Sequence, residues 1–439
     1  MYTFYLKDNI YFHDGTSITS DDIEFTIMQI QDSSIKSPKR ANWDGVTVEK
    51  IGEKQIRFIL KKPYSPFIEN TTVGILPKHI WKNVSTEEFA FSQFNIEPVG
   101  SGQYQIKSIN RDSGGLIQYY ELLSFKKYAL GKPYISSIFI RFYPNEKALL
   151  SAYASGYIQN MNGIAPQEAK SLKTKEIRIE TTPLPRIFAV FLNQNNVPLF
   201  ADQAIRQALN MAMPKEAILK EVLQGYATAI DGPIPSTINF VDSTSFNDRI
   251  NEAKKILAKD GWQINQSGVL EKKTKKDTSV LQFSLATSNA PELRQSAEII
   301  KDAWAKLGIN VIIKIFDTGD LNQNIIRTRK YDALLFGEII GRDPDLFAFW
   351  HSSQRNDPGL NIAMYVNSKV DKILEDARVI SNPEDRKEKY KEFNDIIHQE
   401  IPALFVYSPN FIYVVAKDIK GLLLGQMTTS GDRFANINR

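Results

Sequence analysis

Cysteine is absent from the 439-residue sequence, so the chain can form no disulfide, thiolate metal site or cysteine nucleophile. Histidine is scarce, and His13, His79, His351 and His398 lack the spacing of metal ligands. The phosphate-binding loop, the dinucleotide-binding glycine pattern and the Gly-x-Ser-x-Gly nucleophile motif are also missing. No sequence motif therefore supports an enzymatic function, and we expect no catalytic residue, no cofactor and no metal site.

Long apolar runs are missing as well, because none approaches the roughly 18–20 residues of a transmembrane helix. The first residues show neither the basic and apolar regions of an export signal nor a lipobox cysteine. Instead, Tyr2, Phe4 and Leu6 alternate with polar residues, as in a half-buried strand. We expect either a cytosolic protein or one whose export signal preceded Tyr2.

Neither sign of charge is in excess, since 54 basic and 50 acidic residues give a net charge of +4. The basic residues are scattered, except in the segment 272–276 (KKTKK), which we interpret as a solvated hairpin or loop. This pattern gives no support for nucleic-acid binding. The length favours two or three domains.

The first part of the chain reads as short strands and helices. Thr19 with Asp22 fits a capping box at the start of a helix. Residues 46–51 and 55–60 alternate as a hairpin. The stretch "EPVGSGQYQIKSI" (97–109) reads as a loop that leads into a strand, and we place a domain junction there. Antiparallel strands are predicted over 102–142, and a helix over 146–155.

The second part is of the α/β type. A strand over 280–286, a helix from Pro291 to the stop at Gly308, and a strand over 309–317 predict a βαβ unit with a parallel pair. Further strands are predicted over 331–340, 403–407 and 411–416, and further helices over 202–212, 215–224 and 382–400. The two halves differ in their predicted secondary structure, which favours two lobes with a cleft between them.

The opening segment "YTFYLKDNIYFHDGTSITSDDIEFTI" strongly resembles the signature of the extracellular solute-binding proteins of the peptide/nickel ABC-importer family, family 5. The match runs through Phe4, Leu6, Phe12, His13, Asp14, Gly15, Thr19 and Asp22. Later stretches resemble further motifs of the family in the same order: "ILPKHIW" (75–81), "PVGSGQYQIKSI" (98–109) and "DPDLFAFWHSSQ" (343–354). The resemblance covers the whole chain.

This resemblance implies an α/β, two-lobed periplasmic-binding-protein-like fold with an extra inserted subdomain. The extra subdomain would be residues 1–97, lobe I residues 98–195 with a return over 416–439, and lobe II residues 196–415. It also implies an N-terminally truncated chain whose lobe I is incomplete. The protein would be a monomer at the periplasm or cell surface, with any export signal or lipoprotein anchor absent from this chain.

The function implied by the resemblance is capture of a solute, most often a peptide, in the interlobe cleft and its delivery to an ABC permease. One alternative is a ligand-sensing receptor of the same fold. Another is a non-peptide solute such as an oligosaccharide or a metal chelate. A hydrolase is disfavoured, because no nucleophile has a base nearby in the sequence.

Candidate ligand-binding residues follow from the resemblance. The extended run that enters lobe II supplies Arg186, Phe188 and Phe191. The strand-to-loop stretch "FGEIIGRDPD" and the segment after it supply Glu338, Arg342, Asp343 and Trp350. Arg327 lies near the place where the family can put a guanidinium for a ligand carboxylate. For Phe188, Phe191 and Trp350 the alternative is a place in the core, which we favour for Trp350. An exposed loop position is the alternative for Arg327, and an N-cap arrangement is the alternative for the Asp-Pro-Asp stretch.

The chain departs from the family pattern in two places. Gln159 stands where members often have Asp. Peptide binders also usually carry an Asp that pairs with the ligand ammonium, where this chain has Ile340 or Gly341. Glu338 is the one acid nearby, and strand alternation decides whether it faces the ligand. We therefore expect a ligand that is longer than the pocket, blocked or uncharged at its amino end, or not a peptide.

Overall fold

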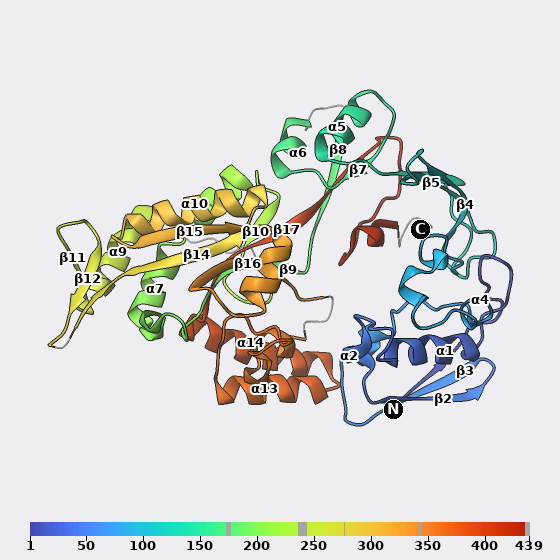
Figure 1. The fold of residues 1–439 in the computed structure, drawn as a ribbon, viewed down its shortest axis with the longest axis horizontal. Coiled ribbons are helices and arrows are strands. Elements are labelled where there is room, and N and C mark those ends of the chain that lie inside the picture. The colour runs from blue at the N-terminus through green and yellow to red at the C-terminus, as the bar shows by residue number, and fades with distance from the viewer. Residues whose placement is uncertain (173–176, 236–243, 276, 342–344, 435–439) are drawn as a thin grey trace. The chain divides into compact units, whose positions relative to one another are not determined.

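The computed structural model describes residues 1–172, 177–235, 244–275, 277–341 and 345–434 (Figure 1). The chain divides into two compact units. The first comprises Met1–Gln159 with Asp418–Leu424 and Arg433–Arg439, and the second comprises Asn160–Lys417 with Gly425–Asp432. The three-part division predicted from the sequence stays a prediction.

The first unit begins with a small antiparallel sheet in the order β1-β3-β2. Its strands are β1 (Tyr2–Tyr5), β2 (Val46–Gly52) and β3 (Gln55–Leu60), and the helices beside it are α1 (Ser20–Gln31), α2 (Arg40–Trp43), α3 (Phe67–Asn70) and α4 (Lys78–Trp81). Its core holds the rings of Trp43, Phe58 and Phe67, whose centroids lie 5.3–5.7 Å apart. The predicted capping box is present at α1, where the Thr19 N–H donates to Asp22 Oδ2 over 2.9 Å.

The His-Asp-Gly stretch of the opening segment is a structural joint within this unit. The Gly100 N–H donates to His13 Nδ1 over 3.3 Å, so the neutral imidazole carries its proton on Nε2. His13 Nε2 then donates to the Gly102 carbonyl over 2.9 Å. Burial lowers the pKa of His13, which favours this neutral form. His79 Nε2 lies 2.7 Å from Asp14 Oδ2 and holds the neighbouring turn.

A second antiparallel sheet completes the first unit, as predicted over 102–142. It is formed by β4 (Tyr104–Arg111), β5 (Ile117–Ser124) and β6 (Ser137–Arg141), in that order. The short turns η1 (Phe89–Phe91) and η2 (Gln93–Asn95) precede it. Asn145 caps the predicted helix that follows, α5 (Glu146–Ala154), by accepting from the Ala148 N–H over 2.9 Å.

The second unit is built on one large sheet in the order β10-β17-β9-β16-β14-β15, with β7 and β8 also paired to β17. The strands are β7 (Met161–Asn162), β8 (Arg178–Pro183), β9 (Arg186–Leu192), β10 (Ala227–Ala229), β14 (Gln282–Ser288), β15 (Asn310–Phe316), β16 (Ala333–Ile339) and β17 (Ala403–Val415). β14 runs parallel to both β15 and β16, and the other pairs are antiparallel.

The predicted βαβ unit is confirmed: β14 leads through α10 (Pro291–Ala305) into the parallel strand β15. Gly308 ends this connection at φ +87°, a conformation that an L residue with a side chain rarely adopts.

The prediction of two separate strands over 403–407 and 411–416 is wrong, because β17 is continuous through Pro409. Its residues up to Tyr407 pair with β9, and those from Asn410 onward pair with β8. Proline has no N–H to donate, and its carbonyl accepts from the Leu184 N–H over 3.0 Å. The strand can therefore change partners at this point without a break.

Helices cover both faces of the large sheet (Figure 1). One face carries α7 (Gln203–Met211), α9 (Phe246–Lys259) and α10, whose apolar side chains share one core with Val190 and Leu285. The other face carries α12 (Phe347–Trp350), α13 (Ser368–Val379) and α14 (Pro383–Glu400), whose core includes Ile187 and Leu334. The strands β9, β14, β16 and β17 thus contribute side chains to two separate cores, one on each face.

Shorter elements complete the second unit. They are α6 (Pro166–Leu172), η3 (Pro198–Ala201), α8 (Lys215–Ala217), η4 (Ile218–Val222), α11 (Thr318–Asp320), η5 (Leu321–Ile326) and η6 (Ser352–Gln354). Lys272 and Lys273 of the basic segment end β12 (Leu270–Lys273), which forms a small sheet with β11 (Gln263–Ile264) and β13 (Thr278–Val280). The last short helix is η7 (Ser430–Phe434). Among the described residues, no helix combines the length and the apolar character that a membrane span requires.

Candidate functional site

The connections of β14 and β16 identify one edge of the large sheet as the candidate site. These strands are parallel neighbours. After β14 the chain enters α10 on one face, whereas after β16 it enters α12 and α13 on the other face. In open α/β sheets, ligands bind beside the carboxyl ends of strands whose connections diverge in this way. The residues that end β14 and β16, here called the carboxyl edge, are therefore the place to search.

The end of β14 is already engaged within the fold. The Asn289 N–H donates to the Phe316 carbonyl over 2.8 Å, and its side-chain amide donates to Asp317 Oδ1. Ser288 Oγ accepts from the Ala290 N–H over 3.3 Å, just before α10 begins. These polar groups fix the turn from strand to helix, so their hydrogen-bonding capacity is partly used.

The end of β16 carries a carboxyl group in a very different state. Glu338 is 5% exposed, and within the described chain neither of its oxygens has a hydrogen-bond partner. Burial raises the pKa of Glu338 well above its ordinary value. The strand register places it opposite Ile187, on the sheet face covered by α12–α14. Within the described residues, Glu338 is therefore a buried acid without a hydrogen-bond partner, and burial favours its neutral form.

Arg186 and Phe188 lie on the opposite face of the sheet from Glu338. Arg186 pairs with Ile339, and Phe188 pairs with Gly337, so both are one step out of phase with Glu338. Phe188 stacks on Tyr407 with ring centroids 4.8 Å apart. A Cβ at Gly337 would come within 2.7 Å of the Phe188 ring, so the glycine makes room for that stack. Arg186 is half-buried, and in the part of the chain that the structure describes its Nε has no hydrogen-bond partner.

Two other candidate residues belong to the core of the second unit. Phe191 and Trp350 are both 0% exposed. The Trp350 indole packs among aromatic rings, with centroids 6.1 Å from Phe393 and 5.9 Å from Phe405. Trp350 therefore packs in the core, which is the alternative that we favoured for it from the sequence.

Arg327 is separated from the carboxyl edge by the length of β16, because it follows η5 and precedes the amino end of that strand. Its guanidinium is exposed and forms a two-point pair with Asp357, with Nε–Oδ1 at 2.8 Å and Nη2–Oδ2 at 2.9 Å. Arg342 and Asp343 lie outside the described residues. Ile340 is buried, and its N–H donates to the Pro185 carbonyl over 2.9 Å.

The segment that follows the carboxyl edge is tied to α13 by Arg378. The guanidinium makes a two-point pair with Asp345, with contacts of 2.7–3.1 Å. It also lies over the Phe347 ring, 3.8 Å from the centroid, and Phe347 in turn stacks on His351 at 4.0 Å. Asp345 Oδ1 accepts from the Phe347 N–H over 3.4 Å, but the N-cap residue of α12 is Leu346, so Asp345 stands one position before the cap.

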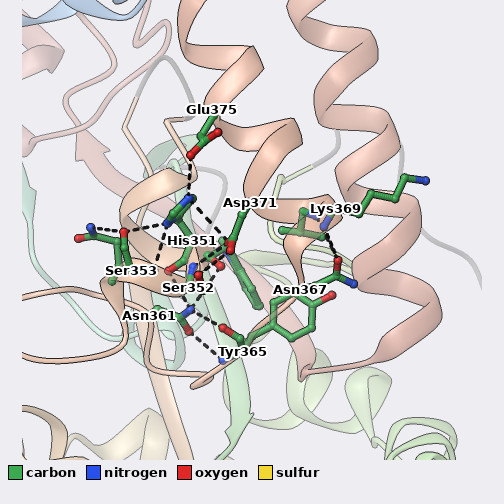
Figure 2. A network of polar contacts seen from close by, with 12 residues as sticks. His351, Ser352, Ser353, Asn361, Tyr365, Asn367, Lys369, Asp371 and Glu375 are labelled. Atoms are coloured by element: carbon green, nitrogen blue, oxygen red, sulfur yellow. Dashed lines mark hydrogen bonds and ion pairs between the residues drawn. The ribbon is translucent and has the colours of Figure 1, made fainter.

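The His351 ring, which stacks on Phe347, also lies close to two acidic side chains of α13 (Figure 2). The Ser353 N–H donates to His351 Nδ1 over 3.1 Å, which leaves the proton of the neutral ring on Nε2. Nε2 faces Glu375 Oε1 at 3.6 Å and Asp371 Oδ1 at 3.9 Å. Asp371, Glu375 and Arg378 stand at i, i+4 and i+7, so one face of α13 holds the whole segment.

A buried amide completes this polar network (Figure 2). Asn361 is 0% exposed, and its Nδ2 donates to the carbonyls of Trp350, His351 and Tyr365 over 3.0–3.3 Å. Its Oδ1 accepts from the Tyr365 N–H over 3.2 Å. The sequence analysis did not find Asn361, because a lone asparagine in an irregular segment carries no periodic signal.

Glu400 differs from Glu338 in the hydrogen bonding of its carboxylate. Its two oxygens accept from the Tyr365 hydroxyl over 2.6 Å and from Asn367 Nδ2 over 2.8 Å. Burial, together with the hydrogen bond to Glu400, raises the pKa of Tyr365 and keeps the hydroxyl as the donor. Both oxygens of Glu400 are therefore satisfied within the fold.

The described residues contain no group of three or more His, Asp or Glu side chains that could hold a metal ion. Ser353 Oγ lies 2.8 Å from His351 Nδ1, a nucleophile–base distance. That nitrogen already accepts the Ser353 N–H in a local helix cap, so the contact is accounted for by the fold.

Comparison with known proteins gives a consistent result. Residues 1–359 match the family model described as bacterial extracellular solute-binding proteins, family 5 Middle. The chain is 28% identical over 432 residues to the oligopeptide-binding protein AppA of Bacillus subtilis, covering 95% of this chain and 77% of that protein.

Two solved structures show the same similarity at the level of the fold. The structure of AppA from Bacillus subtilis in complex with a nonapeptide is 27% identical, with a TM-score of 0.74 over 100% of this chain and 86% of that one. The structure of NikZ from Campylobacter jejuni in complex with Ni(L-His) is 26% identical, with a TM-score of 0.76 over 100% of this chain and 87% of that one.

Proposed function

The chain belongs to the bacterial extracellular solute-binding proteins of family 5, and on that premise we propose that it captures peptides for an ABC importer. The observation that carries the proposal is the similarity to AppA of Bacillus subtilis over nearly the whole chain, since that protein is an oligopeptide-binding protein and has been solved with a nonapeptide. Family membership also supports a periplasmic or cell-surface location and delivery of the peptide to permease subunits.

The second unit supports this function with a defined edge for the ligand. The carboxyl edge has a topology that favours ligand binding, and it holds Glu338, an acid whose oxygens have no hydrogen-bond partner among the described residues. The segment behind it is fixed by the Arg378–Asp345 pair. Rigid support of this kind holds a binding site in its productive geometry.

The other candidate residues differ in where they lie relative to the carboxyl edge. Arg186 and Phe188 are near the same edge on the opposite face, and their contact with solute remains a proposal. Phe191 and Trp350 serve this function through the core beneath the edge. We also propose that the protein acts as a monomer and carries out no turnover, because its family consists of binding proteins.

The test exposes the purified chain to a random nonapeptide library and identifies the retained peptides by mass spectrometry. A retained peptide, added back at about 100 times its Kd, should stabilise the chain by roughly 2.7 kcal/mol. The recovered peptide should be uncleaved. Nickel with L-histidine serves as the competing ligand, motivated by the similarity to NikZ. Stabilisation by the nickel complex alone would contradict the peptide assignment.

A further inference from the structure

His13 is a titratable group that the proposed function does not use, and one loop engages both of its ring nitrogens. The Gly100 N–H donates to Nδ1 over 3.3 Å, and Nε2 donates to the Gly102 carbonyl over 2.9 Å. The His13 N–H also donates to the Gly100 carbonyl over 2.8 Å. One ring nitrogen must therefore accept a hydrogen bond while the other donates one, which only the neutral imidazole can do.

These hydrogen bonds join the two sheets of the first unit. His13 lies between β1 and α1, beside the first sheet, and residues 100–103 lead into β4 of the second sheet. The His13 ring also meets the Phe125 ring edge-on, with centroids 5.0 Å apart. Phe125 follows β5 and is buried, and its N–H donates to the Gln103 carbonyl over 2.9 Å. His13 and Phe125 thus hold the same loop.

The acid next to His13 is already engaged with other partners. Asp14 Oδ1 accepts from the Thr16 N–H over 3.0 Å, and Asp14 Oδ2 lies 2.7 Å from His79 Nε2. Burial lowers the pKa of His13, although the Gly102 hydrogen bond and the charge of Asp14 act in the opposite direction. Desolvation of the ring therefore outweighs the attraction of Asp14, and the fold favours the neutral imidazole.

The other segments that contact this joint bring positive charge or none. Lys126 and Lys127 follow Phe125 and are exposed, and Lys127 Nζ lies 4.3 Å from the centroid of the Tyr11 ring. Residues 100–103 (GSGQ) carry no titratable side chain. A positive charge on His13 would gain no acidic partner from the loop that it holds, and the two lysines would not stabilise it.

We propose that His13 is a pH-sensitive joint, in which protonation of the ring at acidic pH loosens residues 100–103 and weakens the connection between the two sheets of the first unit. When Nδ1 takes up a proton from solvent, its lone pair forms the new N–H bond, and the Gly100 N–H loses its acceptor. The Nε2–Gly102 bond persists, so the loop opens at Gly100 first.

This property goes beyond solute capture and does not depend on the identity of the solute. Members of this family lie outside the cytoplasm, where the pH of the surroundings reaches the protein directly. Histidine is the side chain whose ordinary titration range allows it to respond to such changes.

Hydrogen–deuterium exchange between about pH 7 and about pH 5, read by mass spectrometry of peptic fragments, tests the inference. Each rate is divided by its intrinsic value, so that only the opening equilibrium is compared. The pKa of His13 in the fold is lowered from 6.5, so the open loop binds the proton more readily and opening is favoured as pH falls below that value. For residues 98–104 the opening constant should rise by up to about tenfold per pH unit, while α1 keeps its protection.

His13→Gln is the informative variant, because the glutamine amide can still donate to the Gly102 carbonyl but cannot take up a proton. At about pH 7 its residues 98–104 should exchange faster than those of the wild type, and their exchange should not change as pH falls. His398→Gln, at an exposed position of α14, is the matched control and should keep the pH dependence of the wild type. His79→Gln should keep it too.

Protection of residues 98–104 that is independent of pH in the wild type would overturn the joint. A pH dependence that persists in His13→Gln, or that disappears in His79→Gln, would also overturn it, because another group would then carry the proton. If His13→Gln does not fold, ring-nitrogen NMR of labelled histidine in the wild type decides, and titration of His13 at or above 6.5 would contradict the joint. None of these outcomes touches the proposed function, which is tested by peptide capture.

Discussion

The carboxyl edge of β16 and the polar network beneath α13 lie on the same side of one sheet, yet the carboxyl and amide oxygens of the two regions are paired to opposite degrees. In the network, Asn361 and Glu400 have every side-chain oxygen paired within the fold. At the carboxyl edge, Glu338 has neither oxygen paired within the described residues. Buried oxygens that are paired within the fold help to stabilise one conformation, whereas a buried carboxyl group without partners is a position where an added donor can bind.

The largest expected effect is on the satisfied side of this comparison. Asn361→Ala removes all the side-chain hydrogen bonds of a fully buried residue and leaves the carbonyls of Trp350, His351 and Tyr365 without this donor. We expect the free energy of unfolding to fall by about 3 kcal/mol. Urea denaturation followed by circular dichroism measures the change, with exposed Asn356→Ala as control. A loss no larger than that of the control would show that the network is not structural.

The next effect has the opposite sign. Glu338→Met replaces the unsatisfied acid by an apolar side chain of similar length, and we expect it to stabilise the chain by roughly 1–3 kcal/mol at neutral pH. Burial raises the pKa of Glu338 in the folded state above its ordinary value of 4.5. The folded wild type therefore holds a proton that the unfolded chain has lost, so its stability falls as pH rises from about 4.5 toward the folded pKa.

The advantage of Glu338→Met should accordingly be small near pH 4.5 and grow with pH by up to about 1.4 kcal/mol per unit. Parallel urea titrations of both chains across this range provide the measurement. An advantage that is constant, or one that shrinks as pH rises, would mean that Glu338 has a counter-charge in the folded protein.

The smallest effect concerns the link between the two regions. Arg378→Met removes the pair with Asp345 and the contact with the Phe347 ring, and we expect a loss of roughly 1 kcal/mol because the guanidinium is partly exposed. Hydrogen exchange of residues 345–353 should quicken, while exchange in α10 should not. Arg294→Met, at an exposed position of α10, is the control. Equal exchange rates for residues 345–353 in Arg378→Met and Arg294→Met would show that Arg378 does not stabilise the segment behind the carboxyl edge.

Local signals in the sequence predicted much of this fold. Pro291 and Gly308 delimited the helix of the βαβ unit, and the antiparallel strands of the first unit followed from alternation. The continuity of β17 through Pro409 was not predictable from the residues alone. A proline usually ends a strand, and only the change of pairing partner explains why it does not do so here.

The candidate site was predictable only in part, because the sheet face on which a strand residue lies depends on the pairing register of the strands. Alternation alone could not say that Glu338 points toward α12–α14 while Arg186 points away, since that follows from the pairing of β9 with β16. The environment of Arg327 was equally hidden, because its partner Asp357 lies 30 positions later in the chain. Trp350 was expected to pack, and the ring contacts around it agree.

The most direct test of the central claim is photo-crosslinking with a retained nonapeptide that carries a benzophenone side chain, followed by mass-spectrometric mapping. We expect crosslinks at the carboxyl edge, within residues 288–290 and 337–341, and their loss when unlabelled peptide competes. Crosslinks confined to the network around Asn361 and α13, or absent from the second unit altogether, would contradict the account.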